Sequence, residues 1–310
     1  MGKCLKRWVV YQRERFPLAS HLPLVAAFSA SAVCFSSLLR GDYRAPSGAA
    51  LGVAFVTSLL FFLQLRIADE FKDREEDARF RPYRPVPRGL VTLRELAWLG
   101  AATAGVQLAL ALWLEPSLVW LLAVTWGYLI LMTREFFAAR WLKAHPLIYL
   151  TSHMLILPLV DLYATACDWR VAGVSGPPVG LSWFLAVSFL NGVVVEIGRK
   201  TRAAADEEHG VETYSALWGR QGAVCGWLLA VLLTATAAWQ ASVRIGTWAP
   251  TGVMLIVLAV ACGVVARRFI GTTRPGSGRW LETMAGVWTV VMYIGLGAAP
   301  LVFTLWRGVR

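Results

Sequence analysis

Carboxylate side chains are concentrated directly after an apolar stretch, in the segment RIADEFKDREEDARFRPYRPVPRGLVT that starts at residue 66. If the preceding helix continues at 100° per residue, Asp69, Asp73 and Asp77 lie at about 0°, 40° and 80° around its axis, and Glu70 and Glu76 flank them. Like charges four residues apart destabilise a helix, so this density predicts a bound cation. Mg²⁺ suits the site, because it takes carboxylate oxygens and bridges to phosphate.

Helix-breaking residues follow these acids, namely Pro82, Pro85, Pro87 and Gly89. They predict a turn that returns three cations over the acidic face: Arg81, Arg84 and Arg88. Cations facing metal-bound carboxylates form an anion site that suits phosphate. The alternative is a solvated helix end whose acids are offset by neighbouring cations: Lys72, Arg74 and Arg79.

A second charged segment, EIGRKTRAAADEEHGVETYSALWG, covers residues 196–219 and also leaves an apolar stretch. If its helix continues, one face carries Glu196, Arg199, Arg202 and Asp206, with Lys200 on the flank. Glu196 lies about one turn inside the apolar boundary, where an ionisable residue is a functional candidate.

Both segments are attached to a strongly apolar chain, which has 57% hydrophobic residues, 16% charged residues and a mean hydropathy of +0.56. These values indicate an integral membrane protein. Strand alternation is absent, so the predicted fold is all-α, with one domain over residues 1–310 and charged loops at 66–94 and 198–220. Nine windows are long enough to cross a bilayer: 22–39, 45–65, 95–114, 117–133, 146–165, 179–197, 222–241, 249–266 and 284–306.

The basic residues divide unequally between the two sides of this predicted bundle. One side collects 24 of the 30 lysines and arginines, including those of both charged loops. The positive-inside rule therefore places the N-terminus and both loops in the cytoplasm and the C-terminus outside. The net charge of +11 indicates topology and attraction to membrane lipids rather than nucleic-acid binding. The five cysteines form no CxxC motif and predict neither a disulfide framework nor a zinc site.

The two segments resemble the aspartate-rich motifs of the UbiA superfamily of intramembrane prenyltransferases, which have nine transmembrane helices. In the first motif, Asp69 takes an asparagine position, Glu70 takes an aspartate position, and Asp73 and Asp77 match. The turn that follows this motif matches at Arg84, Pro85, Pro87 and Gly89. The second motif matches at Asp206, Gly210, Thr213 and Gly219.

This resemblance implies Mg²⁺-dependent transfer of a prenyl group from an isoprenoid diphosphate to a lipophilic or aromatic acceptor, with release of pyrophosphate. The implied catalytic and metal-binding residues are Asp69, Glu70, Asp73, Asp77 and Asp206. The candidate diphosphate-binding residues are Arg81, Arg84 and Arg88 from the predicted turn, Arg199, Lys200 and Arg202 from the second segment, and Arg140 and Lys143 from a third basic cluster. The expected acceptor or pocket residues are Gln64, Tyr149, His153, Asn191 and Glu196. The active site is expected to open to the cytoplasmic side.

The second motif departs from the family pattern, because Arg199 and Arg202 occupy two positions that usually hold aspartates. In one interpretation, these arginines bind the diphosphate directly in place of a second metal ion. In another, they form helix-end ion pairs with Glu196 and Asp206, each contributing a few tenths of a kcal/mol. In a third, they receive an anionic group of a different substrate.

Two other functions remain open alternatives. A membrane terpene cyclase or a phosphosugar transferase would use the same fold with a different nucleophile. A lipid-binding or transport protein without catalytic activity would keep the bundle, although the polar residues in the spans are too few for an obvious ion path.

Overall fold

Every regular element between residues 2 and 308, the part of the chain that this computed structural model describes, is a helix. The α-helices are α1 (Gly2–Arg15), α2 (Leu18–Leu39), α3 (Gly48–Lys72), α4 (Arg74–Phe80), α5 (Leu93–Leu114), α6 (Leu118–Thr133), α7 (Ala139–Ala144), α8 (Pro146–Met154), α9 (Ile156–Trp169), α10 (Leu181–Arg199), α11 (Tyr214–Arg244), α12 (Trp248–Ile270), α13 (Gly278–Leu296) and α14 (Ala298–Gly308). Two short 3₁₀ turns cover Glu135–Phe137 and Ala204–Asp206.

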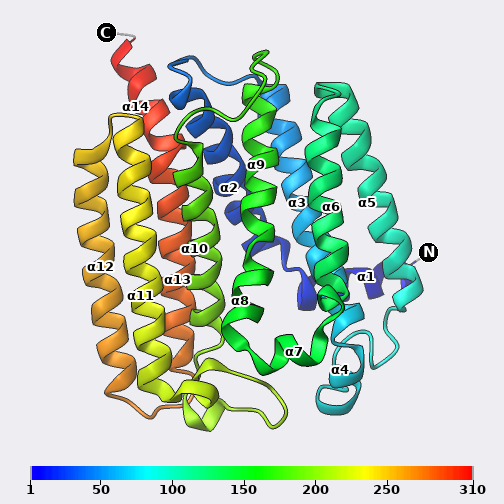
Figure 1. Ribbon diagram of the computed structural model, residues 1–310. Helices are drawn as coiled ribbons and strands as arrows, with labels where there is room; N and C mark the ends of the chain where they lie inside the picture. The colour runs from blue at the N-terminus through cyan, green and yellow to red at the C-terminus, as the bar shows by residue number, and fades with distance from the viewer. Residues whose placement is uncertain (1, 309–310) are drawn as a thin grey trace.

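Long apolar helices form a bundle in which neighbouring segments run up and down (Figure 1). Eight segments of residues 2–308 are long and apolar enough to cross a membrane, and α6 is a shorter apolar helix that runs beside them. The helix pairs α8/α9 and α13/α14 each form one crossing. Pro158 lacks an amide hydrogen to donate to Met154, which explains the interruption between α8 and α9. The all-helical membrane fold is therefore confirmed, and the nine expected crossings are approximately reproduced.

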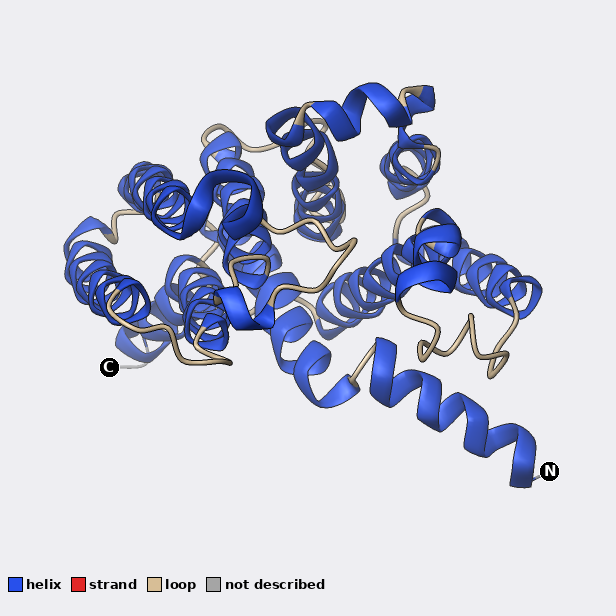
Figure 2. Cartoon of the chain, turned by 90° about the horizontal axis from the view of Figure 1, so that it is seen from below, coloured by secondary structure: helices blue, strands red, loops and turns tan. Residues whose placement is uncertain are grey.

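Both charged segments lie at the same end of the bundle, the end that carries α4 and the connection from α10 to α11 (Figure 1). The chain leaves the opposite end through α14. Seen end on, α1 runs along one edge of the bundle, and it does not continue the direction of the bundle helices (Figure 2). This arrangement places the two motif segments close enough to share one site. Which side of the membrane this end faces stays a prediction.

Neither membrane-spanning helix continues through its motif, so the expected continuous helical faces are wrong. The first motif is broken at Asp73 (φ −89°, ψ 8°), between α3 and α4, where several like charges repel one another. The second is broken after Arg199, since α10 ends there. The Thr201 hydroxyl donates to the Ile197 carbonyl at 2.7 Å, and the Tyr214 amide donates to the Lys200 carbonyl at 2.9 Å. These bonds satisfy terminal carbonyl groups of α10 without further helical residues.

Candidate active site

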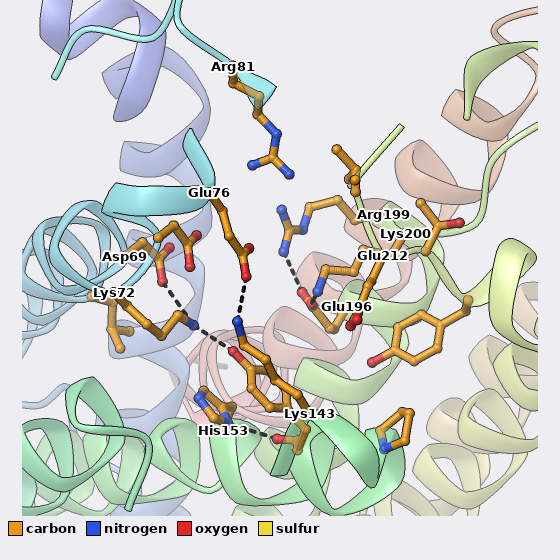
Figure 3. Close-up of a pocket in the computed structure, with 18 of the residues that line it drawn as sticks. Asp69, Lys72, Glu76, Arg81, Lys143, His153, Glu196, Arg199, Lys200 and Glu212 are labelled. Carbon is orange, nitrogen blue, oxygen red and sulfur yellow. Dashed lines mark hydrogen bonds and ion pairs between the residues drawn. The ribbon is translucent and has the colours of Figure 1, made fainter. Parts of the chain in front are cut away.

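A cavity of about 560 Å³ opens at the charged end of the bundle, between the two motif segments (Figure 3). Its walls come from the end of α3, from α4 and the turn after it, from α8 and the start of α9, and from the end of α10 with the following loop. The deeper part is apolar, with Leu65, Met132, Met154, Ile156 and Leu157. The cavity thus combines a charged mouth with an apolar floor.

Carboxylates of the first motif form one wall of the mouth, and those lining the cavity are Asp69, Asp73 and Glu76. Asp69 pairs with Arg66 at 3.2 Å and lies 3.9 Å from the Lys72 ammonium. Burial raises the pKa of Asp73, and the charges of Asp69, Asp77 and Glu76 add to this effect, while Lys72 opposes it. Asp69 and Glu76 are thus paired with cations, whereas burial and neighbouring acids disfavour the charge of Asp73, an effect that a bound cation would relieve.

Three other carboxylates that the sequence assigned to metal binding point elsewhere. Glu70 is buried and pairs with Arg15 of α1. Asp77 is buried and accepts hydrogen bonds from Arg81 at 3.0 Å and Arg84 at 2.6 Å. Asp206 accepts a hydrogen bond from the Gly276 amide at 2.6 Å, in the loop before α13. None of the three lines the cavity.

The opposite wall, from the second motif segment, carries three cations and three carboxylates: Arg199, Lys200 and Arg202 with Glu196, Glu208 and Glu212. Glu196 accepts from Arg199 at 2.6 Å and lies 2.9 Å from the Lys200 ammonium, so this one carboxylate is held between two cations. Arg81, from the turn after α4, points across the cavity toward Arg199 (Figure 3). Two guanidinium groups that face each other across open space favour an anion between them.

The remaining predicted diphosphate-binding residues divide into two groups. Arg84, Lys143 and Arg202 line the cavity. Arg202 donates to the Asp206 carbonyl at 3.3 Å and to Glu208 at 3.2 Å. The hydrogen bond from Lys143 to Glu76 raises the pKa of Lys143 and joins α7 to α4 at the mouth of the cavity (Figure 3). Arg88 and Arg140 lie outside the lining, and Arg88 pairs with Glu14 of α1 at 2.8 Å.

Of the predicted acceptor residues, Glu196, Tyr149 and His153 line the cavity. Lys72 donates to the Tyr149 hydroxyl at 2.8 Å, and the His153 ring stacks on the Tyr149 ring with centroids 3.9 Å apart. Gln64 and Asn191 are buried outside the lining. Gln64 donates to Thr103 at 3.0 Å and to Gln107 at 2.9 Å, which is an interhelical network within the bundle rather than a substrate contact.

Sequence reasoning assigned no role at the site to several residues that line the cavity: Arg15, Arg66, Lys72, Glu135 and Glu212. The charged loops offered a signal for Arg66, Lys72 and Glu212, whereas Arg15 is far away in sequence. Glu135 is buried and begins three consecutive non-glycine residues with positive φ, at 46°, 51° and 58°. Such left-handed backbone is rare for these residue types and clusters at functional sites.

The two motif segments touch at Gly210 and Phe80. Gly210 has φ +77°, and a Cβ atom there would lie 2.7 Å from the Phe80 ring, so glycine suits both the backbone and the close approach. His209 also meets Phe80 edge to face, with ring centroids 5.9 Å apart. This contact fixes the spacing between the two motif segments, which form opposite walls of the cavity.

We expect Gly210→Ala to lower the free energy of unfolding by about 1–3 kcal/mol, because it adds overpacking against Phe80 to backbone strain. Gly89→Ala is the matched control, since Gly89 has φ +74° and no atom lies within 4 Å of the position that a Cβ would take there. Thermal unfolding in detergent measures both variants. Equal losses in the two would show that the Phe80 contact contributes nothing.

The donor chemistry of the first wall fits Mg²⁺, which prefers carboxylate oxygens and keeps several waters. Asp69 and Asp73 are the residues placed to hold it, with Glu76 beside them. Within the described residues, His, Cys, Asp and Glu side chains form no preassembled group of three at metal-binding distance. A metal would therefore be held by few protein ligands, completed by water and by substrate oxygens.

Comparison with known proteins agrees with this architecture, which defines a helical membrane protein with a charged cavity at one end. The sequence profile of the UbiA prenyltransferase family matches residues 27–285, so the chain belongs to that family. No curated protein sequence matches the chain closely enough to count as a relative.

Solved structures share the fold at low identity. A UbiA homologue from Aeropyrum pernix K1 in its apo form is 18% identical, with a TM-score of 0.65 over 89% of this chain and 97% of its own. A UbiA homologue from Archaeoglobus fulgidus bound to DMAPP and Mg²⁺ is 13% identical, with a TM-score of 0.62 over 94% and 99%. A structure described for digeranylgeranylglyceryl phosphate synthase is 13% identical, with a TM-score of 0.56 over 90% and 99%.

Proposed function

We propose that this protein is a Mg²⁺-dependent membrane prenyltransferase that moves a prenyl group from an isoprenoid diphosphate to a lipophilic or aromatic acceptor and releases pyrophosphate. The observation that carries the proposal is one cavity lined by the carboxylates Asp69 and Asp73, by the guanidinium groups of Arg81 and Arg199, and by apolar side chains. Family membership and the Archaeoglobus fulgidus homologue bound to DMAPP and Mg²⁺ support the same substrate class.

Each part of the cavity has a distinct task in this reaction. When bound, Mg²⁺ stabilises negative charge on the departing pyrophosphate. Asp69 and Asp73 would hold the metal, and Arg81 and Arg199 donate hydrogen bonds to the diphosphate oxygens. The apolar floor takes the isoprenoid tail and keeps water away from the allylic carbon.

In the second motif segment, arginine and lysine side chains take the place of a metal ion. Arg199 and Lys200 both pair with Glu196, which leaves that carboxylate neutralised and unsuited to a further metal ion. Asp206 is occupied by the Gly276 amide. We therefore assign the metal to the first motif and direct binding of the diphosphate to the second. This favours the interpretation in which Arg199 and Arg202 bind the diphosphate in place of a second metal ion.

The test is pyrophosphate release by purified protein in lipid nanodiscs, with dimethylallyl, geranyl and longer isoprenoid diphosphates, Mg²⁺ and a membrane lipid extract as acceptor source. We expect Mg²⁺-dependent release that increases with the extract, together with a prenylated product in the mass spectrum. Release with a cyclic product and no acceptor would indicate a cyclase. No release with any of these donors would contradict the proposal.

A further inference from the structure

The N-terminal helix α1 is attached to the first motif segment by charge and by packing. Tyr11 is buried in a small apolar cluster with Ile67, Val91 and Leu96. Three ion pairs reach from α1 to the elements around the motif: Arg7 to Glu95, Glu14 to Arg88, and Arg15 to Glu70. Ion pairs spaced along α1 thus join it to α3, to the turn after α4 and to α5.

The innermost of these pairs is almost entirely buried, with exposed side-chain fractions of 9% for Arg15 and 1% for Glu70. Burial opposes the charge of Arg15, but the Glu70 carboxylate more than compensates and raises the pKa of Arg15. Breaking a buried pair leaves an uncompensated charge, which is strongly unfavourable. Glu70 is therefore not available to a metal ion unless Arg15 finds another anion.

Arg15 also lines the cavity, although it lies in a different helix from both motifs. Its Nε donates to Glu70. For the two terminal nitrogens, Nη1 and Nη2, the described part of the chain offers no hydrogen-bond acceptor. A guanidinium that uses only Nε for its ion pair keeps two nitrogens whose fork geometry suits phosphate oxygens.

We propose that α1 belongs to the active site: Arg15 binds the diphosphate through its terminal nitrogens, and Glu70 is the positioning residue that holds Arg15 rather than a metal ligand. This inference rests on the proposed function. It replaces the metal-binding role that the motif resemblance implied for Glu70. The anion is then gripped from three elements, namely α1, the turn after α4 and the end of α10.

The first test compares Arg15→Ala with wild type for binding of inorganic pyrophosphate and geranyl diphosphate at saturating Mg²⁺, using the full chain in nanodiscs. We expect affinity to fall about 10-fold to 100-fold, which corresponds to lost charge-assisted hydrogen bonds. The Mg²⁺ midpoint should stay within about twofold, because Arg15 supplies no metal oxygen. The affinity of Arg15→Lys should lie between those of wild type and Arg15→Ala, since lysine keeps the charge but lacks the forked donor geometry.

Glu14→Gln is the control, because Glu14 is the neighbouring residue of α1 and its partner Arg88 lies outside the cavity. Its pyrophosphate affinity should stay within about twofold of wild type. The double variant Arg15→Glu/Glu70→Arg restores an ion pair, so it should recover thermal stability without recovering affinity. Wild-type affinity in this double variant would mean that the pair is merely structural.

Glu70→Gln separates the two roles of Glu70. We expect it to weaken pyrophosphate binding while leaving the Mg²⁺ midpoint unchanged, whereas a Mg²⁺ requirement raised as much as in Asp73→Asn would make Glu70 a metal ligand and overturn the inference. Unchanged affinity in Arg15→Ala would overturn it as well. If wild type itself bound neither pyrophosphate nor geranyl diphosphate, the proposed function would fail with it.

Discussion

Replacing Asp73 by asparagine is expected to reduce Mg²⁺-dependent pyrophosphate release by on the order of 100-fold or more. Asp73 lies at the break between α3 and α4 and lines the cavity, where burial and neighbouring acids raise its pKa. Asparagine keeps the size and one oxygen but removes the charge that attracts the metal. The measurement is the rate of pyrophosphate release as a function of Mg²⁺ concentration.

Asp77→Asn is the matched control for this change, because both residues belong to the same motif and only Asp73 lines the cavity. Asp77 is buried between Arg81 and Arg84, so its replacement should cost about 1–3 kcal/mol of stability. Its Mg²⁺ dependence should remain close to wild type. If Asp77→Asn raises the Mg²⁺ requirement as strongly as Asp73→Asn, the assignment of the metal to Asp69 and Asp73 is wrong.

Replacing Arg199 by alanine is expected to lower affinity for an isoprenoid diphosphate about 10-fold and to change the Mg²⁺ midpoint much less. Arg199 lies at the end of α10 and points toward Arg81 across the cavity (Figure 3). Its side chain is about half exposed to solvent. Losing it removes a direct hydrogen-bond donor to the anion but no metal ligand. Equilibrium binding of geranyl diphosphate at several Mg²⁺ concentrations separates the two quantities.

Arg268→Ala is a suitable control, since Arg268 is an exposed arginine near the end of α12 and lies outside the cavity lining. It removes the same charge from the protein without removing a contact at the site. Its diphosphate affinity should match wild type. Unchanged affinity in Arg199→Ala would instead support the interpretation of Arg199 as a helix-end partner of Glu196.

The sequence was sufficient to predict the features that depend on long, uniform patterns. Apolar windows predicted the apolar helices, including the short one at α6, and the spacing of the charged loops predicted that both motif segments meet at one end. The resemblance selected Asp69 and Asp73, the predicted turn selected Arg81, and the departure from the second motif drew attention to Arg199; all four line the cavity. Each of these features is set by composition or by local spacing, and none depends on a contact between distant segments.

At two positions, tertiary contacts decide what a local pattern does not reveal. Helical phase placed Asp206 beside Arg199, but the α10 carbonyls are satisfied by Thr201 and Tyr214, and the chain leaves the helix there. Motif position made Glu70 a metal candidate, but Arg15 neutralises it from 55 residues away. Neither contact has a signature in the neighbouring residues, because each depends on where a distant segment packs.

The most direct test of a metal on one wall and cations on the other is a crystal structure with geranyl diphosphate in which Mn²⁺, an anomalous scatterer, replaces Mg²⁺. Anomalous peaks should appear only beside Asp69 and Asp73, with the pyrophosphate oxygens reaching from the metal to Arg81 and Arg199. A second metal peak beside Glu196 or Asp206, with Arg199 turned away from the diphosphate, would contradict this account.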